Sequence, residues 1–155
     1  MATIVKENYT YTLDTIESIA SVLLTCVEKA YEKRKTAKAT VLFLSGDLGA
    51  GKTTLVQEIG KLLHVEEKII SPTFILKSSY KVHHECFDTL IHIDAYRFEN
   101  KDESKVLKIE RDIDNAKNLI IIEWPHNMHT IKPSVVADII TIDEDTRSIT
   151  LHYEK

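Results

Sequence analysis

Three of the chain's four glycines lie close together, at Gly46, Gly49 and Gly51. The segment Gly46–Thr53 reads GDLGAGKT and fits the pattern G-x-x-x-x-G-K-[ST]. An apolar run, Val41–Leu44, precedes the segment, and residues with helical spacing follow it. Because glycines allow left-handed backbone conformations and close approach to a ligand, the segment predicts a loop whose amides bind phosphate between a strand and a helix.

The pattern also predicts which groups contact the phosphates of a bound nucleotide and its Mg²⁺. Lys52 is expected to reach the β- and γ-phosphates, Thr53 to bind Mg²⁺ through its hydroxyl, and Thr54 to reach the α-phosphate. The residues of this loop expected to contact the nucleotide are Asp47, Leu48, Gly49, Ala50, Gly51, Lys52, Thr53 and Thr54. A glycine-rich turn that matches by chance is the alternative, and the flanking strand and helix argue against it.

Apolar runs alternate with helical patterns along the rest of the chain. Helices are expected at 14–35, where Asp14 would cap the first turn, and at 53–63, with a partly helical stretch between 100 and 118. Strands are expected at 41–44, 69–70, 75–82, 90–93, 119–122, 139–142 and 149–153. The order predicts an α/β fold, a single P-loop NTPase domain over 1–155 with three layers, a mostly parallel central sheet and antiparallel C-terminal edge strands.

Two acidic residues end apolar runs, Asp94 in LIHID and Glu123 in LIIIE. Since carboxyl ends of parallel strands meet at one edge of a sheet, both are expected beside the phosphate-binding loop. We expect Glu123 to hold the metal and orient water, and Asp94 to hold the metal through water or to couple it to a moving loop. With Lys52 they form the expected catalytic set. A solvated acid is the alternative for either, and Trp124 is expected to stack near the nucleotide or to pack.

The segment SPTF, residues 71–74, is a turn signal between two apolar segments. One interpretation is a mobile loop that brings the Thr73 hydroxyl to the γ-phosphate. The other is a connection fixed by Pro72, because proline sets its own φ and restricts the residue before it.

Composition limits the classes of function. The net charge of -4 gives no strong global attraction to nucleic acid. The sequence contains neither the order of a secretion signal nor an apolar run of roughly 20 residues, so we expect a cytoplasmic protein without membrane contact. Cys26 and Cys86 match no metal spacing and are expected to be buried or inert thiols. His83 and His84, with Cys86, are expected in a surface loop rather than at a metal.

The motifs GDLGAGKTT, SPTF, HIDAYR and IEWP occur in that order within residues 41–125 and resemble the TsaE family, also called YjeE. That family comprises small bacterial P-loop ATPases required for threonylcarbamoyladenosine synthesis on tRNA. The resemblance implies ATP hydrolysis with Mg²⁺ that drives turnover of a complex of TsaD and TsaB. That complex modifies adenosine 37 of tRNAs reading ANN codons, so tRNA would be reached indirectly.

The same resemblance implies residue roles. Lys52 would bind phosphate, Thr53 and Glu123 would hold the metal, and Asp94 would support both metal and catalysis. Trp124 matches the family's tryptophan. The family places residues from the start of the chain and from the last strands near the adenine, and Thr12 and Arg147 are the candidates here. Two segments depart from the family, at 98–118 and 81–88, and both bear on the partner-facing surface.

A small-molecule kinase is the alternative function. Such kinases share the loop and the size, and usually carry an arginine-bearing lid over the phosphates. Before the final hairpin this chain has only Arg34, Arg97 and Arg111, which do not cluster in sequence. An assay of phosphate transfer to small acceptors separates the two functions.

Overall fold

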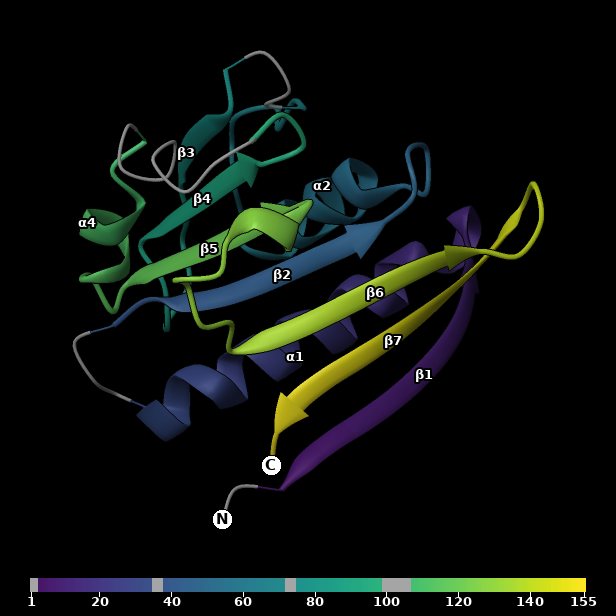
Figure 1. Ribbon diagram of the computed structural model, residues 1–155, viewed down its shortest axis with the longest axis horizontal. Coiled ribbons are helices and arrows are strands. Elements are labelled where there is room, and N and C mark those ends of the chain that lie inside the picture. Colours follow the sequence, from purple (N-terminus) through teal and green to yellow (C-terminus); the bar gives the residue numbers. More distant parts are fainter. Residues whose placement is uncertain (1–2, 35–37, 72–74, 99–106) are drawn as a thin grey trace.

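The computed structural model describes residues 3–34, 38–71, 75–98 and 107–155, which form a sheet with helices on both faces (Figure 1). The sheet has seven strands in the order β1-β7-β6-β2-β5-β4-β3. The strands are β1 (Ile4–Thr12), β2 (Thr40–Gly46), β3 (Lys77–Lys81), β4 (Thr89–Asp94), β5 (Asn118–Glu123), β6 (Val135–Thr141) and β7 (Thr146–Glu154). The helices are α1 (Ile16–Arg34), α2 (Lys52–Leu62) and α4 (Ile109–Ile113), with 3-10 turns η1 (Leu13–Thr15) and η2 (Pro125–Asn127).

The centre of the sheet is parallel. Strands β6, β2, β5 and β4 run in the same direction, whereas β1, β7 and β3 pair antiparallel with their neighbours. The pairing sets Glu123 opposite Leu44 on one side and opposite Asp94 on the other. The carboxyl ends of β2, β4 and β5 therefore meet at the edge where the Gly46–Thr53 loop begins. The predicted α/β fold, with a mostly parallel centre and antiparallel C-terminal strands, is confirmed.

Two apolar cores cover the two faces of the sheet and give the three predicted layers. Helices α1 and α2 pack on one face, while α4, which contacts β5, and η2, which contacts β2, lie on the other (Figure 1). Every residue of β5 is buried, as expected of a parallel strand covered on both faces. None of the helices in the described part of the chain has the length and apolarity that crossing a bilayer requires.

The N-terminal strand was not predicted. Strand β1 pairs antiparallel with β7 along its whole length and forms the outer edge of the sheet. Helix α1 begins only after η1, so the expectation that Asp14 caps it is wrong. The turn is closed instead by Thr15, whose Oγ1 accepts the Thr12 N–H at 2.9 Å.

Other parts of the chain also differ from the prediction. Residues 69–70 form no strand, because Ile69 packs against α2 at Gly60, where an added Cβ would lie 2.2 Å from Ile69 Cδ1. Strand β3 covers only the middle of 75–82, and β6 begins at Val135 rather than at 139. In 100–118 the structure describes one short helix, α4. Thr73 of the SPTF segment, whose hydroxyl was expected to reach the γ-phosphate, lies outside the described residues.

Candidate functional site

The loop from Gly46 to Thr53 joins β2 directly to α2. Gly49 has φ 80° and Gly51 has φ 96°, both in the left-handed region. A Cβ at either position would meet nothing within 4 Å, so glycine is required by the backbone conformation rather than by space. The first helical hydrogen bond runs from Leu55 N to Gly51 O at 3.0 Å. The amides of the first turn, Lys52 to Thr54, therefore have no helical acceptor and are directed out of the helix end, where an anion binds best, while the Ala50 N–H donates to Asp47 O at 3.0 Å.

Lys52 lies across the mouth of this loop and is only 5% exposed. Its Nζ donates to Gly46 O at 2.6 Å and to Asp47 O at 3.0 Å. The same ammonium lies 4.1 Å from the centroid of the Trp124 ring. Burial lowers the pKa of Lys52, and the carboxylates of Glu123, Asp94 and Asp47 oppose that shift. The cation is held here by carbonyl oxygens, which phosphate oxygens can replace.

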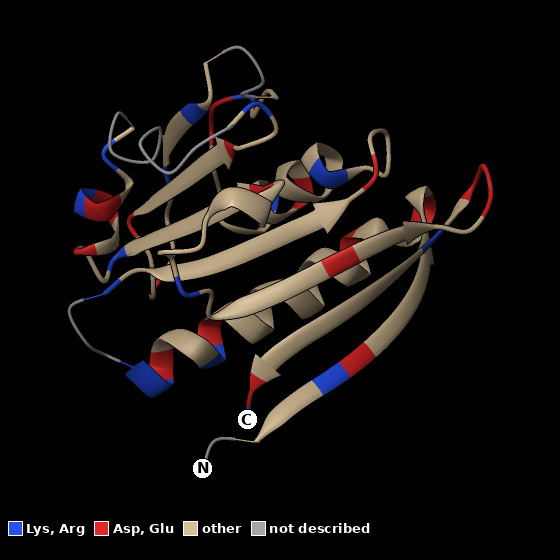
Figure 2. Cartoon of the chain, in the orientation of Figure 1, with Lys and Arg blue, Asp and Glu red and all other residues tan. Residues whose placement is uncertain are grey.

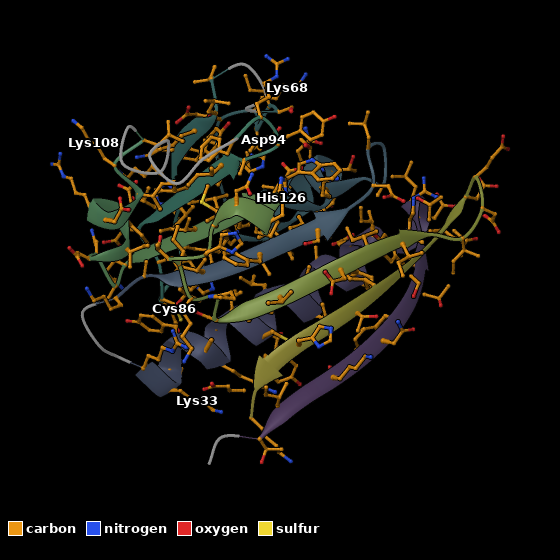
Figure 3. The ribbon with its side chains drawn as sticks, in the orientation of Figure 1. Lys33, Lys68, Cys86, Asp94, Lys108 and His126 are labelled. Carbon is orange, nitrogen blue, oxygen red and sulfur yellow. The ribbon has the colours of Figure 1, made fainter. Side chains whose placement is uncertain are left out.

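Two buried carboxylates lie next to the start of α2, and Figure 3 labels one of them, Asp94, at the end of β4. The Thr53 hydroxyl donates to Glu123 Oε2 at 3.2 Å and lies 3.3 Å from Oε1. Asp94 Oδ1 accepts the Tyr96 N–H at 2.9 Å. The loop hydroxyl, the carboxylate of β5 and the carboxylate of β4 are thus assembled at one point, as the sequence predicted.

This donor set fits Mg²⁺. The ion takes oxygen ligands and is usually held by one or two carboxylates, with substrate phosphates and water supplying the rest. Thr53 and Glu123 offer a hydroxyl and a carboxylate in contact, and Asp94 offers a second carboxylate beside them. Across the described residues, no group of three or more His, Cys, Asp or Glu side chains could hold a metal ion by itself. Substrate phosphates and water would supply the other oxygen ligands of a metal held by Thr53 and Glu123.

Two pockets meet across the loop and share Gly49, Gly51 and Thr54. The smaller pocket, about 300 Å³, contains the lysine and the carboxylates and is lined by Leu48, Gly49, Gly51, Lys52, Thr53, Thr54, Ser71, Asp94, Glu123 and Trp124. The larger one, about 630 Å³, is lined by Tyr11, Thr12, Leu13, Asp14, Ile16, Gly49, Ala50, Gly51, Thr54, Glu144, Asp145 and Arg147. The two pockets therefore adjoin at the loop.

Arg147 connects the loop to the turn between β6 and β7. Its Nε donates to Ala50 O at 3.3 Å, and one terminal nitrogen donates to Asp143 O at 2.8 Å. This turn carries acidic side chains at its tip, drawn in red beyond β6 and β7 in Figure 2. The arginine thus places the hairpin as one wall of the larger pocket, with Thr12 at the end of β1 in the same lining.

Trp124 has an unusual backbone conformation, with φ 57° in the left-handed region. Its N–H donates to Leu44 O at 3.2 Å, which continues the pairing of β5 with β2 by one residue. The indole lies against Tyr96, with ring centroids 4.9 Å apart, and over the Lys52 ammonium. A left-handed non-glycine residue costs about 1–2 kcal/mol, and here that conformation places the ring over the smaller pocket.

The predicted site residues come together with one partial exception. All of them line one of the two pockets except Asp47, which is exposed and contributes a carbonyl to Lys52. Sequence reasoning gave no individual role to Tyr11, Ser71 or His92, although the motifs SPTF and HIDAYR begin with the last two. The last of these could have been noticed, because a histidine two residues before Asp94 in an apolar strand must share its face.

The other predicted cluster lies elsewhere, in the loop that follows β3. His84 Nε2 lies 2.9 Å from Glu28 Oε1 on α1, and His83 is exposed. Cys26 and Cys86 are both free and buried, as predicted. This loop contributes nothing to the two pockets at the phosphate-binding loop.

Comparison with known proteins agrees with the geometry. The family model described as "Threonylcarbamoyl adenosine biosynthesis protein TsaE" matches residues 15–150. The protein named tRNA threonylcarbamoyladenosine biosynthesis protein TsaE from Nostoc sp. is 41% identical over 115 residues, or 70% of this chain and 67% of that protein. Its namesake from Haemophilus influenzae is 35% identical over 122 residues, or 77% of this chain and 73% of the relative.

A solved structure shares the fold. The crystal structure of Bacillus subtilis YdiB superposes with a TM-score of 0.67 at 22% identity, covering 100% of this chain and 88% of that one. At that identity the likeness concerns the fold, whereas the family rests on the match over 15–150 and on the curated relatives. The resemblance seen in the four sequence motifs is thereby confirmed, and the chain belongs to the TsaE family of tRNA threonylcarbamoyladenosine biosynthesis proteins.

Proposed function

We propose that this chain is the Mg²⁺-dependent subunit that binds and hydrolyses ATP in the machinery making threonylcarbamoyladenosine in tRNA. One observation carries the proposal: a buried lysine, a hydroxyl–carboxylate pair and a second carboxylate lie together at the loop before α2, where two pockets adjoin. Each feature has a separate use in phosphoryl transfer, and the fold brings all of them together.

Nucleotide binding follows from the loop and the two pockets. The amides of Gly49 and of Gly51 to Thr53 would donate to phosphate oxygens, supported by the positive end of α2, whereas the Ala50 N–H donates within the loop to Asp47 O at 3.0 Å. Lys52 would exchange its two carbonyl contacts for phosphate oxygens without leaving the loop. The adenosine would extend over the shared residues into the larger pocket, between Thr12 and Arg147. Binding there would require little movement of the main chain.

The carboxylates would then act on the terminal phosphate. Thr53 and Glu123 would hold Mg²⁺, with Asp94 reaching it through water, and the ion supplies positive charge that offsets the charge of the phosphates. A Glu123 carboxylate oxygen can accept a hydrogen bond from water and orient it toward the γ-phosphate. Burial of both acids excludes competing solvent.

Hydrolysis by the isolated chain is expected to be slow. Among the described residues that line the two pockets, Arg147 is the one arginine, and it lies on the adenosine side. A cation that neutralises the transferring phosphoryl group accelerates such reactions by several orders of magnitude. We therefore infer that a partner completes the site. A complex of TsaD and TsaB is the proposed partner, with tRNA reached through it and the cytoplasm as the compartment.

The test compares ATP hydrolysis by the chain alone, with the TsaB–TsaD complex, and with that complex plus tRNA. We expect a low basal rate, stimulation by the partner and dependence on Mg²⁺. Glu123→Ala should abolish the stimulated rate, while Glu66→Ala, at an 88% exposed side chain, should leave it unchanged. Transfer of phosphate to a small acceptor without hydrolysis would favour a kinase. A fully active Glu123→Ala variant would refute the assignment of that residue.

A further inference from the structure

A histidine lies directly behind the proposed metal-binding carboxylate. His92 is on β4 and is 0% exposed. Its Nε2 contacts Glu123 Oε2, the oxygen that also accepts from the Thr53 hydroxyl at 3.2 Å. In the register of β4 with β5, His92 lies opposite Ile121, one step along the same face from the Asp94–Glu123 pair. His92 thus reaches Glu123 from inside the protein, on the side away from the pocket lining.

Folding alone gives no reason for this residue. The neighbours of His92 on its face of the sheet, Leu90 and Ile121, are apolar and fully buried. The second ring nitrogen, Nδ1, is buried and has no hydrogen-bond partner among the described residues. A buried polar atom without a partner lowers stability, so an aliphatic side chain would suit the core better. What distinguishes the histidine from an aliphatic residue here is its hydrogen bond to Glu123.

We propose that His92 is a positioning residue for the Glu123 carboxylate, and this inference rests on the proposed function. By donating from Nε2 to Oε2, the imidazole holds one carboxylate oxygen and fixes the plane of the group. Oε1 is left for the metal or for water, beside the Thr53 hydroxyl at 3.3 Å. Without the donor the carboxylate can rotate, and a Mg²⁺ ligand that rotates binds more weakly. Partners of this kind orient ligands in many metal sites.

Two amide substitutions separate this role from packing. In His92→Gln the amide nitrogen lies as many bonds from the backbone as Nε2, so it can still donate to Glu123. In His92→Asn the amide reaches only the position of Nδ1. A matched control is His152→Asn, because His152 also faces an acid, with Nε2 3.5 Å from Asp138 Oδ2, on the opposite face of the sheet. All three replace a histidine with an amide in a strand.

The measurement is partner-stimulated ATP hydrolysis as a function of Mg²⁺ and of ATP, together with calorimetric binding of ATP with and without Mg²⁺. For His92→Asn we expect a Mg²⁺ requirement raised about tenfold or more and a lower kcat, with metal-free ATP affinity unchanged. His92→Gln should recover most of the loss, and His152→Asn should match the wild type. Equal impairment by the Gln and Asn variants, or wild-type behaviour of His92→Asn, would overturn the proposal.

A second measurement uses the wild-type chain and needs no activity. Nitrogen-15 NMR of the imidazoles should show a protonated Nε2 at His92 whose signal shifts when Glu123 is replaced by alanine. An unprotonated Nε2 at His92 would overturn the proposal even if the variants do not fold. The two claims fail separately: a wild type that binds no Mg²⁺–ATP contradicts the proposed function, whereas an active wild type with an active His92→Asn contradicts only the positioning role.

Discussion

Replacing Lys52 with methionine removes the cationic donor of the phosphate-binding loop and changes little else. Methionine is unbranched and of similar length, so it can fill the space under Trp124 and keep a favourable contact with the ring. The substitution also takes away the two hydrogen bonds to Gly46 O and Asp47 O. Carbonyl oxygens at the loop surface can then be hydrated, and the fold should persist.

The expected loss of affinity can be worked out from the contacts. A hydrogen bond to a charged group contributes about 1.5–3 kcal/mol, which corresponds to roughly 10- to 150-fold in a dissociation constant. Lys52 must first give up its carbonyl contacts at 2.6 and 3.0 Å, so the lower half of that range is expected. Its burial acts in the opposite direction, because a poorly hydrated ammonium interacts more strongly with phosphate.

Titration calorimetry with ATP and Mg²⁺ measures this loss. Lys61→Met is the matched control, because Lys61 lies on the same helix with a 72% exposed side chain that pairs with Glu58. We expect Lys61→Met to bind ATP as the wild type does and Lys52→Met to bind it roughly 10-fold or more weakly. Affinities within twofold of each other for all three proteins would refute the role given to Lys52.

Three further predictions concern the loop, the larger pocket and a thiol. Gly51→Ala forces φ 96° on a residue with a Cβ. Thermal unfolding should show that the free energy of unfolding falls by about 1–2 kcal/mol. Arg147→Ala frees the β6–β7 turn from Ala50 O, so ATP affinity should fall while inorganic triphosphate affinity is retained. Burial raises the pKa of Cys26 from 9.0 to about 11, and mass spectrometry should show alkylation at pH 8 about 100-fold slower than for a free thiol. Because folding raises this pKa, the neutral thiol favours the folded state below pH 9.0, and a urea titration should show that contribution lost as pH rises toward about 11.

The parts of the fold that could be predicted are those encoded locally. The loop pattern fixes a turn between Val41–Leu44 and the next helix, and the acids at 94 and 123 end continuous apolar runs. Strand β1 escaped prediction because its inward face is not purely apolar. Glu7 lies on that face, where it accepts hydrogen bonds from Tyr9 Oη at 2.8 Å and Tyr153 Oη at 2.9 Å. The contact with Tyr153 is 146 positions away in the sequence, so the sequence alone does not show that this carboxylate is paired rather than solvent-exposed.

The candidate site also has a part that is encoded locally and a part that depends on tertiary contacts. The phosphate side lies on one loop and two strand ends, so spacing and fold class suffice to assemble it. The larger pocket, proposed to hold the adenosine, joins the end of β1 to the β6–β7 turn, more than a hundred residues away in sequence, and the antiparallel pairing of Thr12 with Thr146 brings them together. The role of His92 depends likewise on the register of β4 against β5. Register is a tertiary property that periodicity does not specify.

The central claim is that the Gly46–Thr53 loop and Lys52 bind the phosphates of ATP. A crystal structure with Mg²⁺ and a non-hydrolysable ATP analogue tests it most directly. The β- and γ-phosphates should accept hydrogen bonds from the amides of Gly49 and of Gly51 to Thr53 and from Lys52 Nζ, with the metal against Thr53 and Glu123 and the adenosine beside Arg147. A nucleotide bound outside these pockets, or Lys52 still hydrogen-bonded to its two carbonyls in the complex, would contradict it.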